Sequence, residues 1–404
     1  MQELENLHAW CALWRVPRVG AKRYARILQA FGSPRAFFAL PDSERQRAGV
    51  TVDSEMLDQA KRGADTDIRW LQDHDDAHIL TLDNAAYPWR LKTIADPPPV
   101  LFARGKPALL AEPQLAIVGS RSPSHEGLEN AKNFASYLTG QGIVITSGLA
   151  QGIDGAAHEG ALAQKNGDLG ETIAVMGTGP DRIYPAKHRD LAYRIAERGC
   201  IITEFPTGTP VKPQSFPRRN RVISGLSLGT LVIEAGLKSG SLITARTALE
   251  QNREVFAIPG SIHNPLARGC NHLIRNGAKL VETAKDIFEE LRPELFAFVE
   301  NEKSDRLISA VTPAKPPMPT RRVPNRPAGA STEPTIAPVQ TAIQFDDDPE
   351  KAALWAALSH DPQPVDVLVQ RSGLPANKIS SMLLMMELNG QVIKQAGGRF
   401  QKKG

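Results

Sequence analysis

The side chains best suited to bind an anion gather in one short basic segment. Arg218, Arg219 and Arg221 place three guanidinium groups within four residues, and Phe216 and Asn220 stand beside them. A guanidinium group pairs two hydrogen bonds with a phosphate, an aromatic ring offers a stacking surface, and an amide can read the edge of a base. This combination favours contact with a flexible single strand of nucleic acid.

The same segment also allows a structural interpretation. Phe216 would then belong to the core, and one of the arginines would pair with Glu204 or Glu234. We favour nucleic-acid contact because the segment supplies cations, a ring and an amide together.

Glycine-containing exits from two apolar runs provide further positions for an anion. Gly119, Ser120 and Arg121 follow one run, and Gly148 and Gly152 interrupt the turn after the next. Glycine lets the backbone approach a ligand closely, and the free N–H groups at a helix start favour negative charge. A tight strand exit with an exposed arginine explains the first tripeptide equally well.

A third position of this kind opens a predicted helix. Ser239, Gly240 and Ser241 offer hydroxyl groups and backbone N–H groups there. Ser239 as a simple helix cap is an equally good interpretation. Taken together, several such positions imply several phosphates, and several phosphates imply a polymer.

Two titratable side chains follow the second glycine-containing turn. Asp154 is expected to cap the helix that begins there. His158 has no paired nucleophile in the sequence, so we interpret it as a packed or hydrogen-bonded histidine rather than a catalytic base.

No cofactor pattern accompanies these segments. The glycine spacing is not GxGxxG and no GxxxxGK[ST] segment occurs, so neither a dinucleotide nor a nucleoside triphosphate is expected. Cys11, Cys200 and Cys270 are odd in number and far apart, which provides neither a CxxC metal pair nor a disulfide framework. We therefore expect no cofactor and a reducing compartment.

The whole chain adds only weak constraints. Its 404 residues suggest two or three domains, and its formal charge of +4 leans mildly towards an anionic partner. It lacks a basic region followed by an apolar run at its start and any stretch of about 18 apolar residues. A cytoplasmic protein without a membrane partner is expected.

Short β-rich runs alternate with helical stretches between residues 79 and 291. Near-continuous apolar strands separated by helices are typical of a parallel sheet covered on both faces. We predict a doubly wound α/β domain over 79–291. The runs cover residues 115–118, 143–145, 172–175, 201–203, 230–233 and 254–258.

Three flanking regions differ in composition from this domain. Residues 1–65 carry apolar positions at helical spacing and predict a small helical domain. Residues 292–345 are predicted to be a flexible linker, because eight prolines fall between 311 and 340 without a hydrophobic period. Residues 346–404 predict three helices and a β-hairpin, the elements of a winged helix.

The third of these helices, predicted over residues 375–388, leaves the partner of the winged helix open. Its apolar side chains suit a core or a protein contact, and few polar or basic residues remain for phosphate. Protein contact and DNA contact are equally supported. The apolar side chains are Met382, Leu383, Met385, Met386 and Leu388, and the residues left for phosphate are Asn377, Lys378, Lys394 and Arg399.

An ordered set of motifs resembles the DNA-processing proteins of natural transformation, the DprA or Smf family. The set extends over roughly residues 79–291, and its specificity comes from the order of many short pieces. The pieces are Tyr87-Pro88, Pro98-Pro99, Leu101, Gly119 to Arg121, Ser147 to Asp154, Tyr184-Pro185, Arg219 to Ser227, Glu234-Ala235, Ser239 to Thr244, Pro259 to Ser261 and Gly269 to Ile274.

The resemblance implies an extended Rossmann fold that forms a homodimer, binds incoming or exposed single-stranded DNA and loads the recombinase RecA onto it, without enzymatic activity. By position in the family, residues 262–280 are a candidate dimer face, although a folding role is equally possible. The implied strand contacts are Arg121, Gly148, Gly152, Phe216, Arg219 and Arg221, and Lys212 stands in the segment where the family often has a lysine.

The flanks follow the same resemblance. The N-terminal turn is similar to a helix-hairpin-helix or SAM-like module, and the winged helix occurs in longer family members. Arg18 stands where the first glycine of the hairpin is usual, which argues against docking on duplex phosphate. Other basic residues nearby are Arg15, Lys22, Arg23 and Arg26.

An enzyme on a related scaffold is the alternative. Residues 223–234 faintly resemble the PGGxGTxxE motif of lysine-decarboxylase-like phosphoribohydrolases, which cleave nucleoside monophosphates. The leading Pro-Gly-Gly is absent, and three residues rather than two separate Thr230 from Glu234. Glu234 is the one acid or base that this interpretation can nominate.

Overall fold

The computed structural model describes residues 2–47, 53–164, 171–295 and, with six internal gaps, 349–402. The chain divides between Lys315 and Pro316 into two compact units. Most of the predicted linker, residues 296–345, lies outside the described residues. The gaps in the second unit are 359–362, 375–378, 380–381, 384–385, 388–390 and 396–398.

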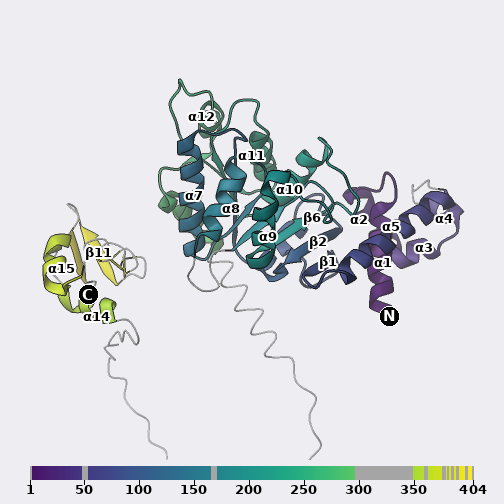
Figure 1. The fold of residues 1–404 in the computed structure, drawn as a ribbon, viewed down its shortest axis with the longest axis horizontal. Coiled ribbons are helices and arrows are strands. Elements are labelled where there is room, and N and C mark those ends of the chain that lie inside the picture. The colour runs from purple at the N-terminus through teal and green to yellow at the C-terminus, as the bar shows by residue number, and fades with distance from the viewer. Residues whose placement is uncertain are drawn as a thin grey trace, which may run out of the picture. The chain divides into compact units, whose positions relative to one another are not determined.

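A mostly parallel sheet runs through the first unit (Figure 1). Its strand order in the described residues is β1-β2-β6-β5-β4-β3-β7-β8-β9. The pairs β1–β2 and β2–β6 are antiparallel, and the remaining pairs are parallel. The strands are β1 (Ala77–Thr81), β2 (Val100–Gly105), β3 (Gln114–Gly119), β4 (Val144–Ser147), β5 (Thr172–Val175), β6 (Cys200–Thr203), β7 (Gly229–Ile233), β8 (Glu254–Ala257) and β9 (Lys279–Leu280).

Helices cover both faces of this sheet, which confirms the predicted doubly wound α/β class. Alternate residues of β3 separate the two cores: Leu115 and Ile117 pack with α7 and α8, whereas Ala116 and Val118 pack with α10 and α11. All six predicted strands are present as β3 to β8. The helices are α7 (His125–Gly140), α8 (Ile153–Leu162), α9 (Arg189–Arg198), α10 (Ser215–Leu226), α11 (Gly240–Glu250) and α12 (Arg268–Arg275), with short α6 (Trp89–Lys92).

The N-terminal helices share one core with the edge of the sheet. Helix α5 continues through residue 65, and the ring of Trp70 near its end lies 5.8 Å from the ring of Phe102 on β2. Ile79 of β1 belongs to the same buried cluster. The helices are α1 (Gln2–Arg15), α2 (Ala21–Phe31), α3 (Pro34–Ala39), α4 (Asp42–Arg47) and α5 (Ser54–Gln72).

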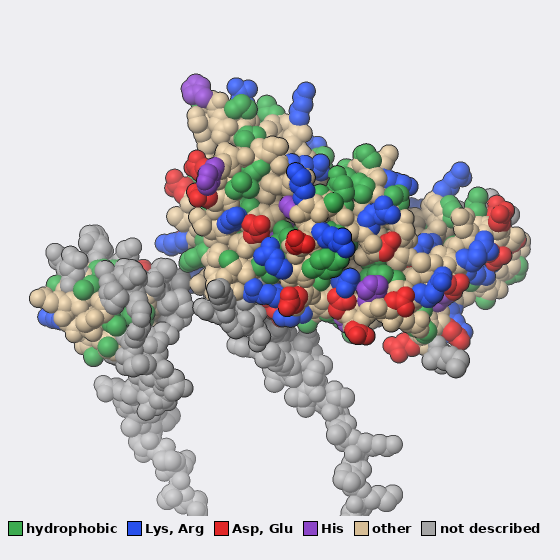
Figure 2. Space-filling view, viewed as in Figure 1, with side chains coloured by type: hydrophobic (Ala, Val, Ile, Leu, Met, Phe, Trp, Pro, Cys, Tyr) green, Lys and Arg blue, Asp and Glu red, His purple; other side chains and the backbone are tan. Residues whose placement is uncertain are grey.

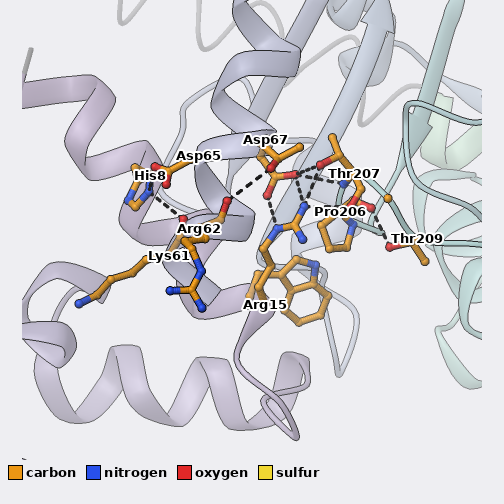
Figure 3. Close-up of polar contacts among 12 residues, drawn as sticks. His8, Arg15, Lys61, Arg62, Asp65, Asp67, Pro206, Thr207 and Thr209 are labelled. Carbon is orange, nitrogen blue, oxygen red and sulfur yellow. Dashed lines mark hydrogen bonds and ion pairs between the residues drawn. The ribbon is translucent and has the colours of Figure 1, made fainter. Parts of the chain in front are cut away.

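A buried ion pair fastens these helices to the loop after β6 (Figure 3). The Arg15 guanidinium donates from Nε and Nη2 to the two oxygens of Asp67, at 2.6 Å each. Asp67 also accepts from the backbone N–H of Thr207 at 3.0 Å and from its hydroxyl at 2.9 Å. Arg15, Asp67 and Thr207 therefore form a junction between the N-terminal helices and the loop after β6.

The second unit has the elements of a winged helix, as predicted. Strand β12 pairs with both β10 and β11 in a small antiparallel sheet. Met382, Leu383 and Met386 are helical and pack in its core. Asn377 and Lys378 lie outside the described residues. The elements are α14 (Pro349–Ala357), β10 (Gln363–Pro364), α15 (Val365–Ser372), β11 (Val392–Gln395) and β12 (Arg399–Lys402). Among the described residues of both units, none of the helices is long and apolar enough to cross a membrane.

Two aspartates of α5, Asp67 and Asp65, should differ widely in how much they contribute to the free energy of unfolding. Asp67→Ala leaves the Arg15 charge without its partner in a mostly buried site, so the free energy of unfolding should fall by about 3–5 kcal/mol. Asp65→Ala removes a carboxylate whose side chain is 59% exposed and pairs with His8, so it should cost only about 0–1 kcal/mol. Denaturant unfolding of both variants tests this. Equal losses in the two variants would show that the junction does not hold the N-terminal helices to the loop after β6.

Candidate nucleic-acid interface

A cleft of about 750 Å³ opens at the carboxyl ends of the parallel strands. Strand β3 pairs with β4 on one side and with β7 on the other, so the chain winds outward in both directions from this point. Such a switch point is where doubly wound sheets receive their ligands. The lining includes Gly119, Ser120, Arg121, Ala150, Asp154, Phe216, Pro217, Arg219, Asn220, Lys238, Ser239, Gly240 and Ser241.

Arg219 projects from α10 into the back of this cleft and is 4% exposed. Its Nη1 donates to the carbonyl oxygen of Val175 at 2.8 Å, whereas its buried Nε has no hydrogen-bond partner among the described residues. Burial lowers the pKa of this guanidinium to about 10, against a partial compensation by Asp154. Because Arg219 also lines the cleft, its guanidinium group is placed to meet an acceptor that enters from outside.

Aromatic rings lie directly beside this cation. The guanidinium carbon of Arg121 is 5.4 Å from the centre of the Phe216 ring, and that of Arg219 is 6.0 Å from it. The ring of Tyr184 lies 5.9 Å from the Phe216 ring, and Tyr184 is 44% exposed. Cationic groups and a stacking surface therefore meet at one place, as the basic segment predicted.

Two glycines leave room for these side chains. A Cβ atom at Gly148 would lie 1.8 Å from Nη1 of Arg219, and one at Gly177 would lie 3.1 Å from the Phe216 ring. Gly152 has φ of +83° at the start of α8, and its Cβ would meet the carbonyl oxygen of Ser120 at 2.3 Å. In the turn after β4, Gly148 thus leaves space for the Arg219 guanidinium, and Gly152 packs against the backbone that follows β3.

Asp154 has a different role from the predicted helix cap. It stands in the first turn of α8, and its carboxylate accepts from the backbone N–H groups of Gly148 at 3.2 Å and Ala150 at 3.4 Å. Its bonds therefore hold the loop before the helix. Burial raises the pKa of this carboxyl group, while Arg219 opposes the shift.

Arg221, predicted as a strand contact, lies on another face of α10. It is 9% exposed, its Nη2 donates to Oε2 of Glu204 at 2.5 Å, and its Nη1 donates to the carbonyl oxygen of Asp96. Arg218 also faces away from the cleft, with its guanidinium 5.2 Å from the ring of Phe205. The structural alternative of an arginine paired with Glu204 thus holds for Arg221 and, at 3.5 Å, for Arg218, whereas Arg219 is the arginine of this segment that lines the cleft.

The remaining candidates divide between the cleft and its surroundings. Ser239 caps α11 by accepting from the N–H of Ser241. Both residues also line the cleft, so Ser239 is a helix cap and a cleft residue at once. Asn220 lines the cleft from α10. Lys212 is exposed and outside the lining. Lys238 belongs to the lining, although no motif in the sequence marks it.

His158 and Glu234 are engaged in structural contacts. His158 is fully buried, and its Nδ1 lies 2.8 Å from the hydroxyl of Thr172. Burial lowers the pKa of its imidazole to about 3, so it is neutral at physiological pH. The two carboxylate oxygens of Glu234 accept from the hydroxyl and the backbone N–H of Ser124. The packed interpretation of His158 is confirmed.

On the face drawn in Figure 2, basic side chains are spread out rather than confined to one patch. Figure 2 shows Lys and Arg side chains across the face that carries α8, α9 and α10, with Asp and Glu among them. This mixture agrees with the small formal net charge of +4. Selectivity for an anion therefore has to come from the lining of individual clefts.

The fold and the cleft define a doubly wound α/β protein with a basic, aromatic-lined ligand cleft at its switch point, followed by a winged helix. Residues 78–292 match the family model of DNA recombination-mediator protein A, and residues 337–398 match the DprA winged helix domain. The chain belongs to the DNA recombination-mediator protein A family, also called DprA or Smf, as the ordered motifs indicated.

Several known proteins are similar over much of their length. Protein Smf of Escherichia coli is 38% identical over 356 residues, covering 87% of this chain and 85% of that protein. DprA from Streptococcus pneumoniae is 35% identical, with 69% of this chain and 95% of that chain covered at a TM-score of 0.60. A structure concerned with the single-stranded DNA binding mode of the Helicobacter pylori protein is 30% identical, with 55% and 98% covered at a TM-score of 0.49.

Gly119 and Gly148 should differ in how much stability is lost when a methyl group is added. A Cβ at Gly119 would lie 2.0 Å from the carbonyl oxygen of Ile233, a backbone atom, so Gly119→Ala should lower the free energy of unfolding by about 1–3 kcal/mol. Gly148→Ala should cost less, because the end of the flexible Arg219 side chain can move aside. Chemical denaturation compares the two. A larger loss for Gly148→Ala would mean that Arg219 is fixed in place.

Proposed function

We propose that the cleft binds single-stranded DNA and that the protein acts as a non-enzymatic carrier of such strands. The observation that carries this proposal is the guanidinium of Arg219 beside the ring of Phe216, both in the lining of the cleft. The guanidinium supplies a charged donor for a phosphate, and the ring supplies a platform for a base.

A single strand fits this arrangement better than a duplex. Bases of a single strand are free to turn and stack on a protein ring, whereas bases of a duplex are already stacked on one another. Phe216 lies inside the cleft, and the exposed Tyr184 stands next to it. A strand that enters the cleft can therefore place its backbone near Arg121, Arg219 and Lys238 and a base against the rings.

The proposal of a carrier rather than an enzyme has support from the engaged state of the candidate acid or base. Both carboxylate oxygens of Glu234 accept hydrogen bonds from Ser124, and Glu234 is outside the cleft lining. His158 is buried and neutral. We find no observation that favours the phosphoribohydrolase alternative.

Family membership extends the proposal to partners. We propose that the protein delivers its strand to the recombinase RecA during transformation or recombination, and that it acts in the cytoplasm as a homodimer of Rossmann-type domains. The three cysteines are free and buried, which suits a reducing compartment. Exposed apolar side chains at Ile262 and Leu280 suit a dimer face.

The cleft predicts two different signatures in binding measurements. Arg121→Ala and Arg219→Ala should each weaken single-strand affinity by about 1–3 kcal/mol and reduce the salt slope by about 0.7, because each removes a phosphate contact. Phe216→Ala should cost about 1–3 kcal/mol through lost stacking, with the slope nearly unchanged. Fluorescence anisotropy with a labelled oligonucleotide at several salt concentrations measures both quantities.

The matched control is Arg194→Ala, which removes an exposed arginine of α9 outside the cleft. Its affinity should equal that of the parent protein. If the three cleft variants also bind like the parent, the cleft is not the binding site. Recovery of the oligonucleotide and of added nucleoside monophosphate unchanged would agree with a carrier, whereas turnover lost in Glu234→Gln would establish the hydrolase.

The proposed dimer face is tested separately by charge. Ile262→Asp places a carboxylate on a side chain that is 73% exposed, so the monomer should still fold. Sedimentation velocity should then show a dimer for the parent and a monomer for the variant. A parent that stays monomeric would overturn the dimer, and a parent that does not speed RecA filament formation on single strands would overturn the RecA proposal.

A further inference from the structure

A second groove, of about 860 Å³, lies on the other side of the first turn of α10. One wall is the turn after α1 together with α2, and the other is formed by α10, α11 and the segment before β2. Its cationic side chains outnumber its acidic ones. The cationic residues are Arg18, Lys22, Arg23, Arg26, Arg218 and Arg221, and the acidic residues are Asp96 and Glu250.

Most of this positive charge is not neutralised within the protein. Arg221 is occupied by Glu204 and Asp96, and Arg218 approaches Glu204 at 3.5 Å while half of its side chain is exposed. The four cations of the turn and α2 are exposed, and none has an ion-pair partner within 4.0 Å in the parts of the chain that the structure describes. The groove is therefore a site of concentrated positive charge in a chain with little net charge.

The groove and the cleft meet at a single residue of α10. Pro217 lines both cavities, while Phe216, Arg219 and Asn220 face the cleft and Arg218 and Arg221 face the groove. An α-helix is only about 10–12 Å across with its side chains. A polymer that occupies the cleft can therefore reach the groove by crossing one helical turn.

The two walls of the groove are held in a fixed relation. The Arg15–Asp67 pair and Thr207 fasten α1 and α5 to the loop after β6 (Figure 3). Helix α2 is fixed to α1, since the Tyr24 ring stacks on Trp10 at 5.5 Å and its hydroxyl donates to the Trp10 carbonyl oxygen. The cations of α2 are thus pre-positioned opposite α10, which lowers the entropic cost of binding.

We propose that the DNA strand bound in the cleft continues over Pro217 into this groove, which grips its phosphates without reading its bases. The proposal rests on the single-strand binding proposed above and extends it to a longer site. The lining of the groove contains cations and no aromatic side chain, so its contacts are with the backbone and depend strongly on salt. The N-terminal helices thereby become part of the DNA-binding surface.

The test compares oligonucleotides of two lengths, about 6 and about 20 nucleotides, which lie near the lower end of single-strand site sizes and beyond their upper end. Lys22→Ala/Arg26→Ala should weaken binding of the longer strand by roughly five- to tenfold and lower its salt slope by about 1.4. Binding of the short strand should be unchanged. The matched control is Arg62→Ala/Arg69→Ala, which removes two exposed cations of α5 outside the groove.

Each other outcome overturns the extension in a recognisable way. If both strand lengths bind the groove variant and the parent equally, the strand does not enter the groove. The cations would attract DNA only through the overall charge of the protein in either of two cases. In the first, the affinity for the short strand falls as much as that for the long one. In the second, the control variant loses as much affinity as the groove variant. A loss confined to duplex DNA would assign the groove to a duplex. If neither strand binds the parent, the proposed function itself fails.

Discussion

The buried contact between Arg221 and Glu204 sets the geometry on which both cavities depend. Glu204 follows β6 and is 1% exposed. Its carboxylate binds Arg221 of α10, and its carbonyl oxygen accepts from the indole N–H of Trp14 on α1 at 2.6 Å. Burial raises the pKa of this carboxyl group, and Arg221 counteracts that shift. One residue therefore ties the sheet, α10 and the N-terminal helices together.

With α10 fixed in this way, the segment of consecutive arginines is divided by helical geometry. Successive residues of a helix point about 100° apart, so neighbours in sequence face different surroundings. Arg219 and Phe216 line the cleft, and Arg218 lines the groove. Arg221 forms the buried ion pair with Glu204. A single basic motif thereby provides a ligand contact, a groove contact and a structural ion pair.

Much of the sheet could be predicted from sequence, whereas the division of the arginines could not. Strands β3 to β8 are short apolar runs, and period and length identify such runs. Strand β2 follows three prolines, Pro97 to Pro99, and β1 contains His78, so neither stands out. That Arg221 pairs with Glu204 depends on a contact 17 residues away. Gly177 carried no local signal for its place against Phe216.

Arg219 places a charge in a buried site, where water solvates it poorly. Arg219 is buried, and its lowered pKa shows that the surroundings disfavour the charged form even with Asp154 near. Asp154 and the carbonyl oxygen of Val175 offset the cost of burying this guanidinium only in part. In return, a guanidinium that is already desolvated loses little hydration when an anion arrives. Burial of this charge is thus a stability cost that makes sense as preparation for a ligand.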